Sequence, residues 1–373
     1  MENSKPRESE MKIRVSRKDL LETAQVVQGV VSTKNALPIL SNMLLEAKKD
    51  KISLMATDLD IAIIVTIPCE VSQEGATTVS AKRFTDILKE LPEDDVALAV
   101  KKNNIVTIDC QNAHFKVNSL PREEFPKLPS YKDHESIDIK QETLKEMLIM
   151  TAFAVSHDET RYILNGVLFE IKPQSLVLVA TDGRRLAYCE KKIETRMLKA
   201  RKIIVPTKAI TELSKTLGEG DSKIYFGENQ ATFDLGNTVI ISRLIEGEYP
   251  RYEQVIPREH KEKLLVKKDL FLSATRRAGL LTNQDSQAIK LDVFKNRLVI
   301  SKNAPDVGET REEMEVEYQG DTLSMGFNPA YLIDVLKNIR EENVGIELTA
   351  PDKPGVIRLK DDYIYVVLPM QIG

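Results

Sequence analysis

Two aspartates separated by one residue, Asp58 and Asp60, have a spacing that could hold a divalent metal ion. Carboxylate oxygens suit Mg²⁺, and a D-x-D pair would serve a metal-dependent nucleotidyltransferase. The tripeptide Ala-Thr-Asp at 56–58, however, occurs again at 180–182. A Thr-Asp pair that recurs in this way is typical of a turn whose side chains hydrogen-bond to nearby backbone. We favour the turn and keep the metal-dependent enzyme as an alternative.

Other catalytic patterns are missing from the sequence. There is no G-x-x-x-x-G-K-[ST] phosphate loop, and the glycine-containing stretch 217–221 is more typical of a helix end followed by a turn. Four histidines show no H-E-x-x-H spacing, and three widely separated cysteines show no zinc-ligand spacing. We therefore expect a non-catalytic protein without a metal or a cofactor of its own.

The composition excludes several classes of protein. The chain has 373 residues, enough for two to four domains, and no uncharged stretch approaches the length of a membrane span. The net charge of −4 gives no reason to expect non-specific nucleic-acid binding from overall charge. Residues 1–10 are polar and predict a disordered tail, neither a secretory nor a transit signal. An odd set of cysteines and no N-x-[ST] acceptor favour a reducing cytoplasm.

An internal repeat organises the chain. Residues 39–62 align with 163–187, and Ile39 matches Ile163 at an offset of 124 residues. A weaker third copy retains the helix start, because Leu20 recurs as Leu144 and Leu270. The repeat predicts three similar domains after the tail, at 11–131, 132–257 and 258–373, with Pro-containing charged linkers over 119–136 and 246–263.

Each repeat contains two amphipathic helical patterns and several strand patterns. The first helices are predicted over 17–31, 141–156 and 267–281, and the second over 81–91, 207–217 and 328–339. Asn328 is a predicted N-cap, with Pro329 at the first helical position. The segments between the helices are rich in β-branched residues and bounded by turn residues. The fold class is therefore α+β, with antiparallel sheets.

Basic charge is concentrated on the predicted helices. Counted over 17–33, 81–90, 141–156, 207–216, 267–281 and 329–340, these helices hold 14 Lys and Arg against 9 Asp and Glu, whereas the whole chain is acidic. Lysine and arginine are good helix formers on solvated faces, which by itself could produce the bias. Lys89, Lys215 and Lys337, however, occupy the same position in the second helix of all three repeats. Such a recurring position could line a common surface that faces phosphates.

With these repeats and the motifs given below, the chain resembles the bacterial DNA sliding clamps, the β subunits of DNA polymerase III. The resemblance covers residues 11 to 373 and rests on ALPILSNMLLE (36–46), SLPREEFPKLP (119–129), RYILNGVLFE (161–170), ATDGRRLA (180–187) and YVVLPMQI (365–372). It implies DNA-clamp domains of two β-α-β-β-β units each, and two chains closing head to tail into a ring around duplex DNA. The implied function is that of a polymerase processivity factor in the bacterial cytoplasm, associated with the nucleoid.

The resemblance also implies a DNA-contacting surface. Its basic and aromatic members, together with the recurring lysines, are Lys34, Lys82, Arg83, Lys89, Arg161, Tyr162, Lys208, Lys215 and Lys337. Contacts of this kind reach phosphates without reading base edges, so binding would be independent of sequence. Asp158 and Ile163 depart from the glutamine and tyrosine of some relatives.

A pocket for a short peptide motif is the second implied site. It would dock the replicative polymerase catalytic subunit, the clamp loader, other polymerases and mismatch-repair proteins. Its residues are Leu164, Thr181, Gly183, Arg184, Arg185, Leu186, Pro250, Val255, Val366, Val367, Leu368, Pro369 and Met370, with the arginines expected to flank and orient the peptide. Taken alone, VVLPM is more often an ordinary buried terminal strand, and only the resemblance favours the pocket. Gln254 and Gln371 replace basic residues of some relatives.

The third implied site is the contact between two chains of a homodimer. One side is a strand edge with Phe115 and Val117, and the other consists of Leu280, Leu281, Glu309, Glu312 and Glu313. Pairing the edge strand across subunits would protect it and close the ring. His114 and Asn112 replace basic residues of some relatives. A repeat-built scaffold that binds proteins without encircling DNA remains the other alternative.

Overall fold

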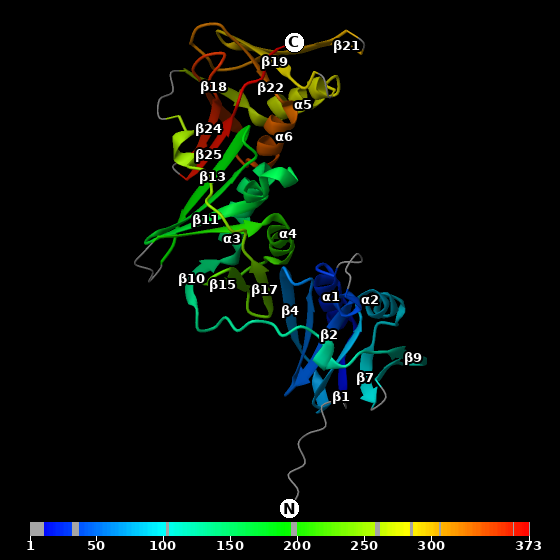
Figure 1. Cartoon of the computed structure of the whole chain (residues 1–373). Coiled ribbons are helices and arrows are strands. Elements are labelled where there is room, and N and C mark those ends of the chain that lie inside the picture. The colour runs from blue at the N-terminus through cyan, green and yellow to red at the C-terminus, as the bar shows by residue number, and fades with distance from the viewer. Residues whose placement is uncertain are drawn as a thin grey trace, which may run out of the picture. The chain divides into compact units, whose positions relative to one another are not determined.

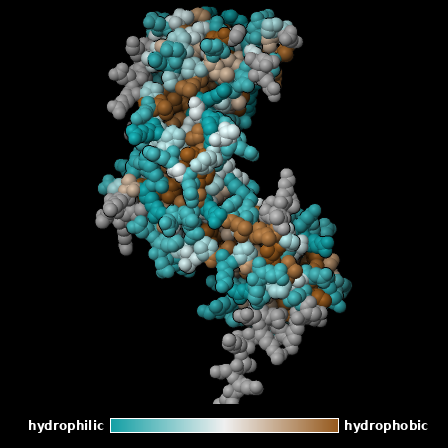
Figure 2. All heavy atoms as spheres, viewed as in Figure 1, coloured by the Kyte–Doolittle hydropathy of each residue, from teal (hydrophilic) through white to brown (hydrophobic). Residues whose placement is uncertain are grey.

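The computed structural model describes residues 11–31, 37–101, 104–194, 200–257, 262–283, 286–305, 307–360 and 362–372. The predicted tail 1–10 and the predicted DNA contact Lys34 lie outside these ranges. None of the helices in the described ranges is long and apolar enough to cross a membrane. Hydrophilic residues cover much of the face seen in Figure 2, with hydrophobic patches between them.

The chain divides into two compact units, and the division falls inside the central repeat. The first unit holds the chain up to Glu142 together with Thr211–Leu244, and the second holds Thr143–Ile210 together with Ile245–Gly373. Helices α3 (Gln141–Thr151) and α4 (Thr207–Thr216) cross from one unit to the other. The three domain boundaries expected from the repeat remain a prediction from the sequence.

The first unit contains two antiparallel sheets and the helix pair α1 (Arg17–Gln28) and α2 (Ala81–Glu90), which lie side by side (Figure 1). The five-stranded sheet has the order β5 (Glu70–Gln73), β1 (Met11–Ser16), β7 (Asp95–Lys101), β8 (Ile105–Cys110), β9 (Ala113–Asn118). The eight-stranded sheet has the order β10 (Glu135–Lys140), β15 (Asp221–Phe226), β16 (Gln230–Asp234), β17 (Thr238–Arg243), β4 (Ile61–Pro68), β3 (Lys51–Thr57), β2 (Asn42–Lys48), β6 (Gly75–Ser80).

The second unit repeats this arrangement with helices α5 (Lys268–Gly279) and α6 (Pro329–Asn338), which contact each other. Its eight-stranded sheet has the order β14 (Arg201–Pro206), β11 (Gly166–Lys172), β12 (Ser175–Thr181), β13 (Arg185–Lys192), β25 (Tyr363–Val367), β24 (Gly355–Leu359), β23 (Asn343–Leu348), β18 (Glu262–Lys267). Its four-stranded sheet has the order β21 (Gly308–Glu315), β20 (Arg297–Ala304), β19 (Ile289–Phe294), β22 (Leu323–Phe327). Short 3₁₀ turns cover Pro38–Ser41, Arg122–Glu124, Ala152–Ala154, Glu159–Leu164 and Tyr252–Gln254.

The α+β class and all six predicted helices are confirmed, to within a few residues at the ends. Asn328 caps α6, because its side chain accepts a hydrogen bond from the Ala330 amide at 2.9 Å, and Pro329 is the first helical residue. Helix α4 ends before the glycine-containing stretch, as expected. The Gly218 amide there donates to the Gln141 side chain at 3.0 Å, which satisfies a polar group beyond the helix end.

Neighbouring repeats share sheets, which the repeat pattern did not predict. In the first unit β17 of the central repeat pairs with β4 of the first repeat, with Ile240 opposite Ile63. In the second unit β13 of the central repeat pairs with β25 of the last repeat, with Leu186 opposite Val366. Each eight-stranded sheet is therefore continuous across a repeat boundary, and its backbone ladder connects the two repeats.

Candidate functional site

The Asp58-Leu59-Asp60 segment is a hydrogen-bonded turn. The Thr57 hydroxyl donates to the Ile61 carbonyl at 2.9 Å and accepts from the Leu59 amide at 3.0 Å. One oxygen of Asp58 accepts from the amides of Asp60 at 3.0 Å and Ile61 at 2.9 Å. Both side chains are therefore used by the backbone, as expected for a turn.

The second copy of the turn has the same bonds. The Thr181 hydroxyl donates to the Arg185 carbonyl at 2.5 Å and accepts from the Gly183 amide at 3.1 Å. Asp182 accepts from the amides of Arg184 at 2.8 Å and Arg185 at 3.0 Å. The turn interpretation is confirmed in both repeats. Among the described residues, no group of three or more His, Cys, Asp and Glu side chains could hold a metal ion.

The third position of each turn has a left-handed backbone, which glycine adopts without strain. Gly183 has φ of +86°, and Leu59 takes the same position with φ of +80°. Gly183→Ala is expected to cost about 1–2 kcal/mol for the backbone alone. The new Cβ would also lie 2.9 Å from an Arg161 guanidinium nitrogen, so that side chain would have to move. Urea denaturation should detect the loss.

Gly236→Ala is the matched control for this substitution. Gly236 has φ of +93°, but no atom lies within 4 Å of its Cβ position, so only the backbone cost applies there. An equal loss in both variants would mean that Arg161 moves freely. No loss in either variant would contradict the assigned strain.

Arg185 is a buried hub, and its expected place at the flank of the peptide pocket stays a prediction. Its guanidinium donates to Asp182 at 3.0 Å, to Asp334 of α6 at 2.7 Å and to the Phe153 carbonyl at 2.7 Å. It also lies 4.6 Å from the centre of the Tyr331 ring, a cation–π distance. The residue is 9% exposed, because the side chain connects the turn, β13 and α6. Its role is to position these elements.

The two sequence segments expected to form the peptide pocket meet through strand pairing. Strand β13 continues the turn and pairs with β25, and the Leu368 amide then donates to the Arg184 carbonyl at 2.9 Å. Leu164, Leu186 and Val366 belong to one hydrophobic cluster that Tyr249 and Tyr252 of the predicted linker also join. The buried members, with Thr181 and Val367, form a floor, and the alternative of a buried terminal strand is therefore correct for Val366 and Val367.

Other predicted pocket residues remain at the surface. Val255 is 54% exposed and Leu368 is 42% exposed, which is high for apolar side chains. Gly183, Arg184 and Pro250 are also exposed, whereas Pro369 and Met370 are half-buried. An apolar rim over an apolar floor can dock side chains of an extended peptide.

A pocket of about 230 Å³ opens beside this surface, lined by Thr160, Arg161, Tyr162, Ile163, Leu164, Glu248 and Pro250. Arg161 and Tyr162, which the resemblance places at DNA, thus share a pocket with Leu164 and Pro250. Arg161 is held there by Asp158 at 2.9 Å and by the Asp182 carbonyl at 2.7 Å. Thr160 and Glu248 were missed, and Ile163 was noted only as a departure from some relatives, although the 3₁₀ turn that carries Thr160 and Ile163 overlaps the quoted motif 161–170.

The predicted helical DNA contacts are all solvent-exposed. Lys82, Arg83 and Lys89 lie on α2, Lys208 and Lys215 on α4, and Lys337 on α6. Two of the recurring lysines have acidic neighbours on their own helix, because Lys89 lies 3.5 Å from Asp86 and Lys215 lies 2.8 Å from Glu212. Part of their charge is therefore offset within the chain.

The predicted dimer-contact residues lie at or beside edge strands. Strand β9, with Phe115 and Val117, is the edge of the five-stranded sheet, and β21, with the three glutamates, is the edge of the four-stranded sheet. Leu281 is half-buried after α5, whereas Leu280 is 79% exposed there. An unpaired strand edge and an exposed leucine are features of a surface that takes a partner.

The acidic residues of β21 already have basic partners within the chain. The Arg277 guanidinium donates to Glu312 at 2.6 Å, and this ion pair lowers the pKa of the Glu312 carboxyl. Glu313 lies 3.5 Å from Arg297 and 3.4 Å from Arg311. Glu309 carries no such ion pair within the described ranges. The acidic run therefore offers less uncompensated charge than its sequence indicates.

Known proteins match this chain over nearly its whole length. Three family profiles, described as domains of the DNA polymerase III beta subunit, match in order: N-terminal over residues 11–129, central over 138–251 and C-terminal over 253–371. The beta sliding clamp of Escherichia coli K12 is 34% identical over 369 residues, covering 97% of this chain and 100% of the relative.

Solved structures agree with the sequence matches. The DNA polymerase sliding clamp of Bacillus subtilis superposes with a TM-score of 0.93 at 31% identity, covering 98% of this chain and 100% of the other. The clamp of Bartonella birtlesii, crystallised with griselimycin bound, gives a TM-score of 0.92 at 32% identity, with 97% and 100% covered. With three successive domain profiles and full-length relatives, the chain belongs to the DNA polymerase III β-subunit family, the bacterial sliding clamps.

Proposed function

We propose that this protein is a DNA polymerase processivity factor that encircles duplex DNA and tethers the replicative polymerase. The observation that carries the proposal is the succession of three clamp domains along the entire chain. The mechanism is one of effective concentration, since a polymerase held by a ring on DNA stays near its primer end even when its direct contact is weak. Such a protein needs no catalytic residue.

The exposed basic side chains of α2, α4 and α6 support a DNA-facing role. Lysines and arginines that contact phosphates provide affinity without sequence information, which is what sliding requires. Lys337 is the recurring lysine without an acidic partner among the described residues, so we assign it a larger share of phosphate binding than Lys89 or Lys215. Arg161 and Tyr162 are predicted DNA contacts that also line the pocket of about 230 Å³.

The surface formed by the second Thr-Asp turn, β13 and the residues after β25 is our proposed docking site for partner peptides. The pairing of β13 with β25 supports this assignment, because it places exposed Leu368 beside Arg184 above an apolar cluster. The griselimycin-bound B. birtlesii clamp supports the idea that clamps of this family take ligands. Partners would be the polymerase, the clamp loader, other polymerases and mismatch-repair proteins.

Closure of the ring would join β9 of one chain to β21 of the next in a head-to-tail homodimer. Both strands are edges, and antiparallel or parallel pairing there would continue the sheet from one chain into the other. Replication clamps act on the chromosome, so we place this protein in the bacterial cytoplasm at the nucleoid.

Retention on circular DNA is the experiment that tests ring closure. The protein is loaded by a cognate clamp loader on nicked circular DNA, which is then linearised in one half of the sample and washed at raised salt. Retention on circles with loss from linear DNA is expected, because salt screens phosphate contacts but cannot release a topological link. Equal loss from both, with an active loader, would contradict encirclement and favour the protein-binding scaffold.

A further inference from the structure

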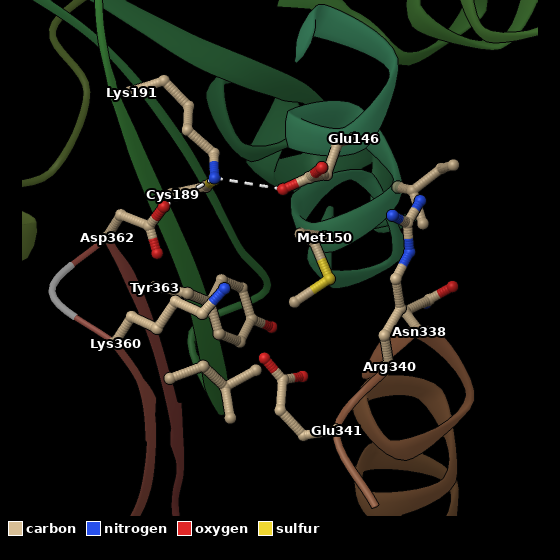
Figure 3. Close-up of a pocket in the computed structure, with 12 residues that line it drawn as sticks. Glu146, Met150, Cys189, Lys191, Asn338, Arg340, Glu341, Lys360, Asp362 and Tyr363 are labelled. Atoms are coloured by element: carbon tan, nitrogen blue, oxygen red, sulfur yellow. Dashed lines mark hydrogen bonds and ion pairs between the residues drawn. The ribbon is translucent and has the colours of Figure 1, made fainter. Parts of the chain in front are cut away.

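A second pocket of about 190 Å³ lies in the second unit, away from the peptide surface. Four parts of the chain form it: α3, β13, the end of α6 with the residues after it, and the adjoining ends of β24 and β25 with Lys360 and Asp362 (Figure 3). Its lining residues are Glu146, Ile149, Met150, Cys189, Lys191, Asn338, Arg340, Glu341, Leu359, Lys360, Asp362 and Tyr363. The volume is below that of a site for a drug-sized ligand, so it would enclose one ring system and leave the rest outside.

One wall of this pocket is fixed by an ion-pair triad. Lys191 of β13 lies 3.0 Å from Glu146 of α3 and 2.5 Å from Asp362 in the turn before β25 (Figure 3). The two carboxylates raise the pKa of the Lys191 ammonium. One ammonium is shared by two carboxylates, so the triad is structural and keeps a net charge of −1 on this wall.

Tyr363 supplies a buried hydroxyl that lacks a partner. The residue is 3% exposed, and its hydroxyl has no hydrogen bond to any described residue. Figure 3 shows the hydroxyl pointing toward the space between Met150 and Glu341. Burial raises the pKa of this phenol well above its usual range, so it is an O–H donor at neutral pH. A buried polar group of this kind costs free energy unless an acceptor reaches it.

Three further charges of the lining have no ion pair within the part of the chain that the structure describes: Arg340, Lys360 and Glu341. Arg340 and Lys360 are exposed, at the rim, and Glu341 is half-buried. Met150, Ile149 and Leu359 provide the apolar surface between them. The pocket thus offers two cations outside, and a carboxylate and an O–H donor beside an apolar wall.

We propose that this pocket binds a guanine nucleotide, with the base inside and the phosphate at the rim. Guanine presents an N–H₂ donor for the Glu341 carboxylate and the O6 acceptor for the Tyr363 hydroxyl, which the base reaches only when the neighbouring side chains move aside, because this hydroxyl is buried. Arg340 and Lys360 suit the phosphate, since charge-assisted bonds from arginine and lysine are the usual phosphate contacts. Adenine has an amino group in place of O6, so it would leave the Tyr363 donor unpaired.

Calorimetric titration of the full chain with GMP, AMP and inorganic phosphate tests the assignment. We expect saturable GMP binding that is at least tenfold tighter than AMP or phosphate binding. Glu341→Gln should weaken GMP binding tenfold or more, because the amide oxygen that replaces the carboxylate has lost the charge that strengthens the hydrogen bond. Glu342→Gln is the matched control, since this neighbour carries the same charge outside the pocket, and it should leave the affinity unchanged.

Tyr363→Phe gives an independent readout. Without nucleotide it should raise the melting temperature by about 2 °C, because it removes an unpaired buried hydroxyl, and it should reduce the stabilisation that GMP provides. A lower melting temperature would mean that the hydroxyl has a partner in the free protein and would overturn the proposal. So would equal affinity for GMP and AMP, binding of phosphate as tight as that of GMP, or no GMP binding at millimolar concentration.

Discussion

Replacement of Arg185 by alanine should lower the free energy of unfolding of the second unit by about 3 kcal/mol. Removing the guanidinium leaves the carboxylates of Asp182 and Asp334 without their partner, and Asp182 is largely buried. The Phe153 carbonyl also loses its donor, and the Tyr331 ring loses its stacked cation. Urea denaturation followed by a probe in the second unit would measure the loss.

The same substitution should weaken binding of a partner peptide. Arg185 fixes the turn and β13. Strand β13 pairs with β25, which ends just before the exposed Leu368. Arg184→Ala is the control for stability only, because Arg184 is the exposed neighbour in the same turn and its loss should change stability by less than about 0.5 kcal/mol. As part of the proposed docking surface, Arg184 should itself contribute to peptide binding. If Arg184→Ala destabilised the unit as much as Arg185→Ala, the hub assignment would be wrong.

A double-mutant cycle would separate the ion pair from the rest of the hub. Asp334→Asn removes one partner of Arg185 while keeping its shape, and the double variant should lose less than the sum of the single variants. Simple additivity would place the stabilisation in the Asp182 and Phe153 contacts instead.

The second large effect is expected at Leu280. A charged residue at the centre of a protein interface removes a contact and buries an unpaired charge, so Leu280→Asp should raise the dimer dissociation constant by about 30-fold or more. The leucine is almost fully exposed in the single chain, so the fold of the unit should not change. Analytical ultracentrifugation over a concentration series would measure the shift, and retention on circular DNA should fall with it.

Leu270→Asp is the matched control for Leu280→Asp. Leu270 lies near the start of α5, is also an exposed leucine, and is not among the predicted contact residues. Dimerisation of this control should match the wild type. A dimer that tolerates Leu280→Asp but not Leu270→Asp would move the interface along α5 and away from β21.

The local structure could be predicted well because its signals lie within a few residues of each other. The helices follow from apolar spacing, the α6 cap from Asn328 and Pro329, and the two turns from the recurrence of Thr-Asp. The role of Arg185 could not be predicted, because Asp334 lies 149 positions along the chain. The pairing of β17 with β4 and of β13 with β25 has no local signal either, since an edge strand looks the same before and after it gains a neighbour.

The candidate sites were predictable only to the level of segments. The resemblance pointed to the second turn and the last strand, which the structure brings together, but it could not separate the buried floor from the exposed rim. That distinction depends on which face of each strand is covered. The ion pairs of the acidic run in β21 could not be predicted either. Its glutamates pair with Arg277, Arg297 and Arg311, and these contacts depend on how the strands and α5 pack.

The shared sheets have a consequence for how this protein can be cut into fragments. The central repeat contributes four strands to each eight-stranded sheet, and its neighbours cover β17 in one and β13 in the other. Fragment boundaries chosen from the repeat alone would expose both strands along their length. Such a fragment would carry two unpaired strand edges, which can pair with other chains and seed aggregation. In the sequence, however, β11–β14 of one eight-stranded sheet lie between β10 and β15–β17 of the other, so no cut of the chain keeps both sheets whole. Recombinant work should therefore use the full chain.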